Sequence, residues 1–143
     1  TVPAFWDWLD AANARGVVFS IQRVRDELLV QEDELTEWVR HRGSAFFLHP
    51  DARTVAALAG VSAWASAQPR FREAAVATFL DAADYYVVAH ASAHGLIVVT
   101  HEAPAPAAEK SIKIPDACLA LNVAYVTPFA MLRDQGARFV LNT

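Results

Sequence analysis

Glycine is scarce in this sequence, and no glycine-rich loop follows any of its predicted strands. Five glycines in 143 residues leave no room for the phosphate-binding loop that opens a nucleotide-binding helix. This absence argues against a kinase and against a dinucleotide-dependent dehydrogenase.

Cysteine and long apolar runs are also lacking. The single cysteine, Cys118, excludes an internal disulfide framework and is typical of a reducing cytoplasm; in an apolar helix it predicts packing and not a nucleophile. No apolar run approaches the ~18 residues of a membrane span. No basic segment followed by an apolar one opens the sequence. We therefore expect a cytoplasmic protein with no membrane partner.

What the sequence does contain is apolar material, at 55% hydrophobic and 20% charged residues. This composition predicts one domain over residues 1–143 with a substantial core. A net charge of −4 argues against a broad polyanion-binding surface but leaves a local basic rim open. Such a rim would draw on Arg23, Arg25, Arg40, Arg42, Lys110 and Lys113.

The first half predicts mostly helices. A helix begins at residues 1–3 and ends at Gly16, a short extended piece follows, and Ser20 can cap a helix over 21–31. On that helix Glu27 borders the apolar face, whereas Asp26 points away from it. Glu27 is thus the acid expected to face inward.

Further helices are expected over residues 32–43, 51–68 and 71–95, with residues 45–48 forming a short buried strand or a connector. The last of these helices should break near Asp81 to Asp84, whose spacing resembles a capping box. His90 and His94 are four residues apart and could present two imidazoles to zinc. Helix packing or capping is the alternative, because no glutamate accompanies them as in a metalloprotease.

The last third alternates strand and helix with short connections, which predicts parallel strands. Leu96 to Val99 shows no polar alternation, so that strand should be covered on both faces. Thr127 and Pro128 predict a helix start, and Gly136 a helix stop. The successive segments are 96–100, 114–122, 124–127, 128–136 and 138–141.

Three acids lie where a parallel sheet keeps its chemistry. Glu102 follows the strand 96–100, Asp116 opens the next helix, and Asp84 lies on an otherwise apolar helix face. Clustered carboxylates would suit Mg²⁺ or Mn²⁺, which prefer oxygen ligands. Taken singly, each acid has a simpler interpretation as a helix cap or a solvated surface residue.

The connector from Glu102 to Ile114 is rich in alanine, proline and charge, and we expect it to be mobile or ordered by a partner. Lys110 and Lys113 would then be placed to meet substrate phosphates.

Four short motifs in this order resemble the PIN-domain nucleases. They are V-x-x-E-L at Glu27, the A-D-Y-Y-V-V-A-H-A helix at Asp84, V-V-T-H-E at Glu102 and I-P-D at Asp116. The chain looks most like small prokaryotic PIN-like proteins related to VapC-type toxins, in which a K-I-P-D segment and an M-L-R-x-x-G-x-R-F tail recur. The resemblance extends from Phe5 to Leu141.

The resemblance implies a three-layer α/β/α sandwich with a central, mainly parallel sheet. It also implies that Glu27, Asp84, Glu102 and Asp116 are catalytic and hold Mg²⁺ or Mn²⁺. Thr100 matches the small hydroxyl residue ending the strand and is expected to bind substrate. The implied activity is hydrolysis of RNA by the toxin of a toxin–antitoxin pair, with an antitoxin partner and a possible homodimer.

One departure from the family concerns the first strand. PIN domains open with a central strand bearing an essential aspartate, and this chain starts after that point. We therefore expect an open slot in the sheet, which an upstream segment fills in the native protein. The alternatives to a ribonuclease are a catalytically silent PIN-like module that binds nucleic acid or protein, and a hydrolase of another kind.

Overall fold

A five-stranded, wholly parallel sheet forms the centre of the molecule. The computed structural model describes residues 3–134 and 138–142. The strand order is β2-β1-β5-β3-β4, and every neighbouring pair is parallel. The predicted parallel sheet is confirmed. Its strands are β1 (Val18–Ile21), β2 (Phe47–Leu48), β3 (Ile97–Val99), β4 (Tyr125–Val126) and β5 (Phe139–Leu141).

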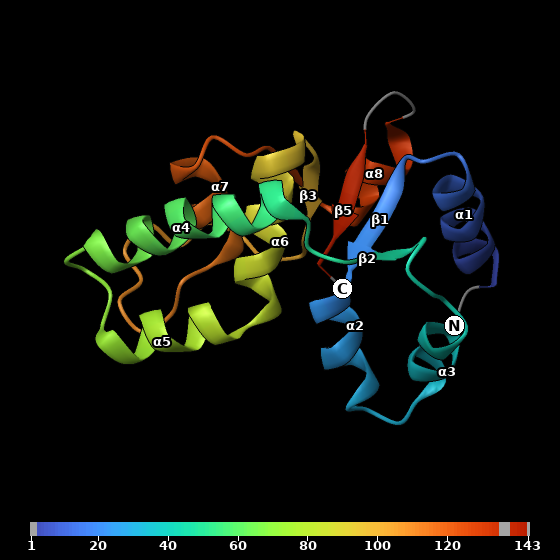
Figure 1. Ribbon diagram of the computed structural model, residues 1–143, viewed down its shortest axis with the longest axis horizontal. Helices are drawn as coiled ribbons and strands as arrows, with labels where there is room; N and C mark the ends of the chain where they lie inside the picture. The colour runs from blue at the N-terminus through green and yellow to red at the C-terminus, as the bar shows by residue number, and fades with distance from the viewer. Residues whose placement is uncertain (1–2, 135–137, 143) are drawn as a thin grey trace.

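Helices cover both faces of the sheet, so the α/β/α sandwich is also confirmed (Figure 1). On one face lie α4 (Ala52–Ala67), α5 (Glu73–Asp81), α6 (Ala83–His94) and α7 (Ile114–Ala120). On the other face lie α1 (Pro3–Ala14), α3 (Glu34–Arg40) and α8 (Pro128–Arg133). Helix α2 (Gln22–Leu29) follows β1 directly and packs against both α3 and α6.

The sheet separates two apolar clusters, and alternate residues of its strands belong to different clusters. In β5, Val140 joins the cluster built on α4 to α7, whereas Phe139 and Leu141 join the aromatic cluster built on α1, α3 and α8. In β3, Val98 and Val99 divide in the same way. This alternation is the period of two expected of a strand, and it confirms that the strand is covered on both faces.

Local sequence signals set most helix ends. Helix α1 ends before Gly16, whose φ of +76° is the left-handed conformation that glycine adopts readily. The Thr127 side chain accepts the Ala130 N–H at 3.2 Å, and Pro128 begins α8 as predicted. The predicted stop at Gly136 lies outside the described residues.

Two predicted caps are wrong. Ser20 does not cap α2, because its buried hydroxyl donates instead to the Leu141 carbonyl at 2.8 Å and ties β1 to the end of β5. The break between α5 and α6 occurs as expected, but the cap residue is Ala82 and not Asp81. An alanine side chain has no hydrogen-bond acceptor, so a capping box cannot form there.

The open slot expected at the centre of the sheet is not seen in the described residues. Strand β5 lies there, paired with β1 on one side and β3 on the other. The backbone groups that an empty slot would leave unpaired are thus engaged within the sheet. The sequence predicted β5 as a strand but not this central position.

Candidate functional site

Most of the predicted site residues lie around one pocket, beside the residues that follow β3. The pocket has a volume of about 200 Å³ and brings Asp84 together with Glu102, Lys110 and Lys113. Helix α6 leads into β3 through Gly95 and packs against it. Asp84 at the start of α6 and Glu102 after the end of β3 therefore both reach this pocket. The prediction that a helix-start acid and a post-strand acid share a crevice is consistent with this arrangement.

Asp84, the second residue of α6, is half-buried in this pocket. Burial raises the pKa of its carboxyl from 3.8 to about 6, with further contributions from the negative charges of Glu102 and Glu27, in that order. The positive charge of Lys113 lowers this pKa but offsets only part of the increase. The ionised form of Asp84 is therefore disfavoured in the folded protein, as is common for acids in functional clefts.

Glu102 is fixed in the pocket by the segments on either side of it. Its N–H donates to the Thr100 hydroxyl at 3.1 Å, and its Oε1 accepts the Ile114 N–H at 2.9 Å. Its Oε2 lies 3.8 Å from Lys113 Nζ. Thr100 is buried and so acts on the site by orienting Glu102.

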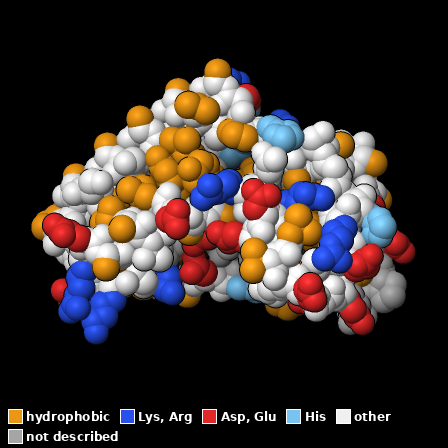
Figure 2. Space-filling model, turned by 60° about the horizontal axis from the view of Figure 1, so that its bottom comes forward, with side chains coloured by type: hydrophobic (Ala, Val, Ile, Leu, Met, Phe, Trp, Pro, Cys, Tyr) orange, Lys and Arg blue, Asp and Glu red, His pale blue; other side chains and the backbone are white. Residues whose placement is uncertain are grey.

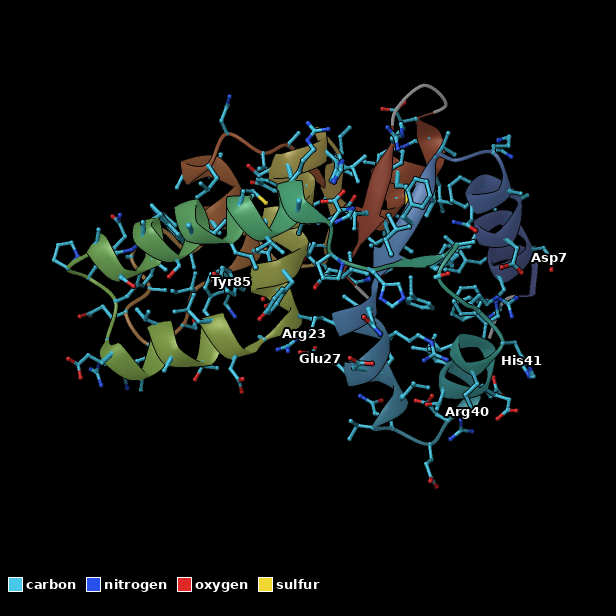
Figure 3. All side chains as sticks on the ribbon, viewed as in Figure 1. Asp7, Arg23, Glu27, Arg40, His41 and Tyr85 are labelled. Atoms are coloured by element: carbon cyan, nitrogen blue, oxygen red, sulfur yellow. The ribbon has the colours of Figure 1, made fainter. Side chains whose placement is uncertain are left out.

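Glu27 reaches the site from α2. Its Oε2 accepts the N–H of Ala83, the first residue of α6, at 2.8 Å. Figure 3 shows Glu27 and Arg23 projecting from α2 toward the junction of α5 and α6. Glu27, which was expected to face inward, makes this contact with α6 but is exposed, as Asp26 is.

Asp116 is buried and serves the connector. Its Oδ2 accepts the Ala105 N–H at 2.9 Å. It is not among the described residues that line the pocket of Asp84 and Glu102, nor among those whose charge acts on Asp84. The structure thus brings Glu27, Asp84 and Glu102 near one another, and Asp116 lies two residues after Ile114, whose N–H bonds Glu102.

The backbone of the connector between Glu102 and Ile114, expected to be mobile or ordered by a partner, is hydrogen-bonded at several points. Both of its ends are tied by carboxylates, through Ala105 to Asp116 and through Ile114 to Glu102. In its middle the Glu109 carbonyl accepts the Arg72 N–H at 2.9 Å. Lys110 and Lys113 are therefore presented to the pocket by a fixed segment.

The pocket continues into a second, more open hollow. The two share Thr78 and Ala82, and the second is lined also by Glu27 and Asp81. In Figure 2, acidic and basic side chains gather across the middle of the face that comes forward from the bottom of Figure 1. A ligand here would meet charges of both signs.

The donor set is compatible with a divalent cation, though sparse. Among residues 3–134 and 138–142, no three histidine, cysteine, aspartate or glutamate side chains are arranged to hold a metal ion. Mg²⁺ often takes only one or two carboxylates and keeps several waters. Asp84 and Glu102 provide two carboxylates whose mutual repulsion a cation would relieve. The chemistry of this pair therefore fits Mg²⁺ or Mn²⁺.

The histidines and the cysteine have structural partners. His90 Nδ1 lies 3.1 Å from the Thr54 hydroxyl in the core, and His94 Nε2 lies 2.7 Å from an Asp51 carboxylate oxygen. These contacts favour the packing and capping alternative over zinc. Cys118 is buried, and burial raises its pKa to about 12, as suits a packing residue.

The sequence placed Arg23 in a possible basic rim but did not predict its contacts at the junction of α5 and α6. Its guanidinium donates to the Asp81 carbonyl at 2.9 Å and lies 4.4 Å from the centre of the Tyr86 ring. The available signal was its spacing from Glu27, since residues four apart share one helix face.

The sequence of the chain matches one known protein family over most of its length. Residues 1–139 match the Domain of unknown function (DUF4411). The chain belongs to the DUF4411 family. No curated protein and no solved structure matches it. The DUF4411 description states no activity, so a function for this chain must be argued from the site. In the described part of the chain, no helix is long and apolar enough to span a membrane.

Proposed function

We propose that this protein is a divalent-metal-dependent endoribonuclease of PIN-like type, acting as the toxin of a toxin–antitoxin pair. The observation that carries the proposal is one pocket in which two carboxylates, Asp84 and Glu102, lie beside two lysines, Lys110 and Lys113. The order of motifs that resembles PIN-domain nucleases supports it. An antitoxin partner, a homodimer and a cytoplasmic location follow from the same proposal.

In this mechanism Asp84 and Glu102 would hold Mg²⁺ or Mn²⁺, and Lys110 and Lys113 would bind phosphates flanking the scissile bond. When bound, the ion lowers the pKa of a water molecule and offsets charge on the phosphate. In the hydrolysis, water would add to phosphorus, the bond to the leaving oxygen would break with its electron pair passing to that oxygen, and the proton lost by the water would reach that oxygen through solvent. Asp84 must be ionised to act as a ligand, so activity should fall below about pH 6.

The test is cleavage of single-stranded RNA with Mn²⁺ or Mg²⁺ added or chelated. Replacing Asp84 by Asn or Glu102 by Gln should lower the cleavage rate on the order of 100-fold. Asp7→Asn is the matched control, because Asp7 is an exposed acid on α1, which lies on the other side of the sheet from α6 (Figure 3). Metal-independent cleavage, or equal loss in the control, would contradict the proposal.

RNA binding can be tested apart from cleavage. Replacing both Lys110 and Lys113 by Ala should weaken RNA binding and reduce the slope of log K against log salt by about 1.4, if each lysine contacts one phosphate. An unchanged slope would remove both lysines from the mechanism.

A catalytically silent binding module is the second candidate. Two observations favour it: both oxygens of Glu102 already have neighbours in Ile114 and Lys113, and the described residues contain no three-ligand metal group. This candidate predicts RNA or protein binding with no cleavage at any metal concentration.

A further inference from the structure

The start of α6 has no cap of its own. Ala82 is both the residue that ends α5 and the residue that precedes α6, and its backbone is extended, with φ −96° and ψ 157°. The first N–H groups of a helix need acceptors from outside the helix, which a side chain at this position usually provides. Alanine provides none, and although the Asp84 carboxyl accepts a hydrogen bond from its own N–H, the Ala83 N–H needs an acceptor from elsewhere.

Helix α2 supplies that acceptor from a position 56 residues earlier in the sequence. Glu27 Oε2 lies 2.8 Å from the Ala83 nitrogen, and its negative charge lies at the positive end of the α6 dipole. One turn earlier on α2, Arg23 holds the Asp81 carbonyl at the end of α5. Together these two side chains grip both sides of the α5–α6 junction (Figure 3).

Asp84 follows immediately after the residue that Glu27 holds. The direction in which its side chain leaves α6 therefore depends on how the first turn of α6 is fixed. Glu102, its partner across the pocket, is fixed separately by Thr100 and Ile114. Without the contact from α2, one side of the pocket would be anchored and the other would be free to fray.

We propose that Glu27 is a positioning residue, whose side-chain oxygen caps α6 and so orients Asp84 in the pocket, and that it is not a metal ligand. This differs from the ligand role that the sequence resemblance implies for Glu27. The part of the inference that concerns metal affinity rests on the proposed function. The part that concerns the cap does not.

Glutamine and alanine at position 27 separate the two roles. A glutamine carbonyl oxygen can accept the Ala83 N–H but is a poor substitute for a carboxylate ligand of Mn²⁺. Alanine removes both the acceptor and the ligand. Asp26→Ala is the matched control, since Asp26 is an exposed acid on the same helix.

The first measurement is the dissociation constant for Mn²⁺, by titration calorimetry on the whole chain. Glu27→Gln should stay within about threefold of the wild type, the change reflecting one lost charge. Glu27→Ala should bind at least about tenfold more weakly, because the Asp84 side of the pocket loses its anchor. Equal, large losses in both variants would identify Glu27 as a ligand and overturn the proposal.

The second measurement is hydrogen exchange at the Ala83 amide without metal or RNA. Glu27→Ala should speed this exchange about fivefold or more, as expected for loss of a cap, whereas Glu27→Gln and Asp26→Ala should leave it near the wild-type rate. Unchanged exchange in Glu27→Ala would refute the cap. A protein that neither binds Mn²⁺ nor cuts RNA would refute the proposed function alone, because the exchange rates would still decide the role of Glu27.

Discussion

Two aspartates at helix starts differ in what the fold does to their charge. Asp51 precedes α4, where its Oδ1 accepts the Thr54 N–H at 2.9 Å and its Oδ2 lies 2.7 Å from His94. Hydrogen bonding to Thr54 lowers the pKa of Asp51 to about 2. Asp84 lies in the first turn of α6, and there burial and two nearby glutamates raise its pKa to about 6.

The helix dipole favours both carboxylates, so it cannot explain opposite shifts. The surroundings decide. Asp51 is solvated, accepts the Thr54 N–H and lies beside His94, whereas Asp84 is half-buried and faces like charge. An aspartate at a helix start can be either a cap or part of a functional site. Its neighbours from distant parts of the chain decide which of the two it is. The destabilised carboxylate is the one that points to function.

The largest expected effect on stability comes from removing the unfavourable charge of Asp84. Between pH 3.8 and about 6 the folded protein binds more protons at Asp84 than the unfolded chain, so this group makes the protein less stable as pH rises. Asp84→Asn should raise the free energy of unfolding at about pH 8 by roughly 1–3 kcal/mol, a range that allows for partial exposure.

Urea unfolding of both proteins at about pH 4 and about pH 8 measures this effect, with Asp7→Asn as the control. The difference between wild type and Asp84→Asn should shrink at the lower pH, where the carboxyl is protonated in the folded state and partly protonated in the unfolded state. A variant that is less stable than the wild type at about pH 8 would show that the Asp84 charge has a favourable partner.

A somewhat smaller effect is expected from adding metal. At a Mn²⁺ concentration ten times the dissociation constant, binding should stabilise the folded protein by about 1.4 kcal/mol. The gain should diminish below about pH 6, because Asp84 must lose its proton to bind the ion. Thermal melts with and without Mn²⁺ at two pH values measure it. Equal stabilisation of Asp84→Asn would place the ion elsewhere.

The smallest effect on stability is expected from removing Asp51, whose charge is favourable. Asp51→Ala removes the α4 cap and should lower the melting temperature by roughly 3 °C at neutral pH. Because the pKa of Asp51 is lowered, its contribution is present above about pH 4 and is lost as pH falls toward 2. Asp26→Ala, at an exposed acid inside a helix, should change the melt less. A melting temperature unaffected by Asp51→Ala would remove the cap from the account of α4.

Features encoded locally were predictable from the sequence. The run from Leu96 to Val99 is wholly apolar, which predicts a buried strand. The adjacent Thr127 and Pro128 predict a helix start. The parallel sheet and its covering helices follow from such signals. The meeting of Asp84 with Glu102 also followed, since both flank the same helix–strand unit.

Contacts between distant segments were not predictable in this way. Ser20 looks like a cap by its place in the sequence, but it is buried against Leu141, 121 residues away. The cap of α6 comes from Glu27, and nothing near Ala82 indicates it. The connector after Glu102 has the composition of a mobile loop, yet its backbone donates hydrogen bonds to the carboxylates of Asp116 and Glu102. In each case a tertiary hydrogen bond overrides the local preference.

The placement of β5 has a consequence for how the protein is made. Among the described strands this one comes last in the chain, yet it is the one that joins β1 to β3. During synthesis on the ribosome, β1 with β2 and β3 with β4 can form only two separate ribbons with exposed edges until β5 emerges. Closure of the sheet is then a late event that links distant segments, which slows folding and leaves those edges open to wrong partners in the meantime.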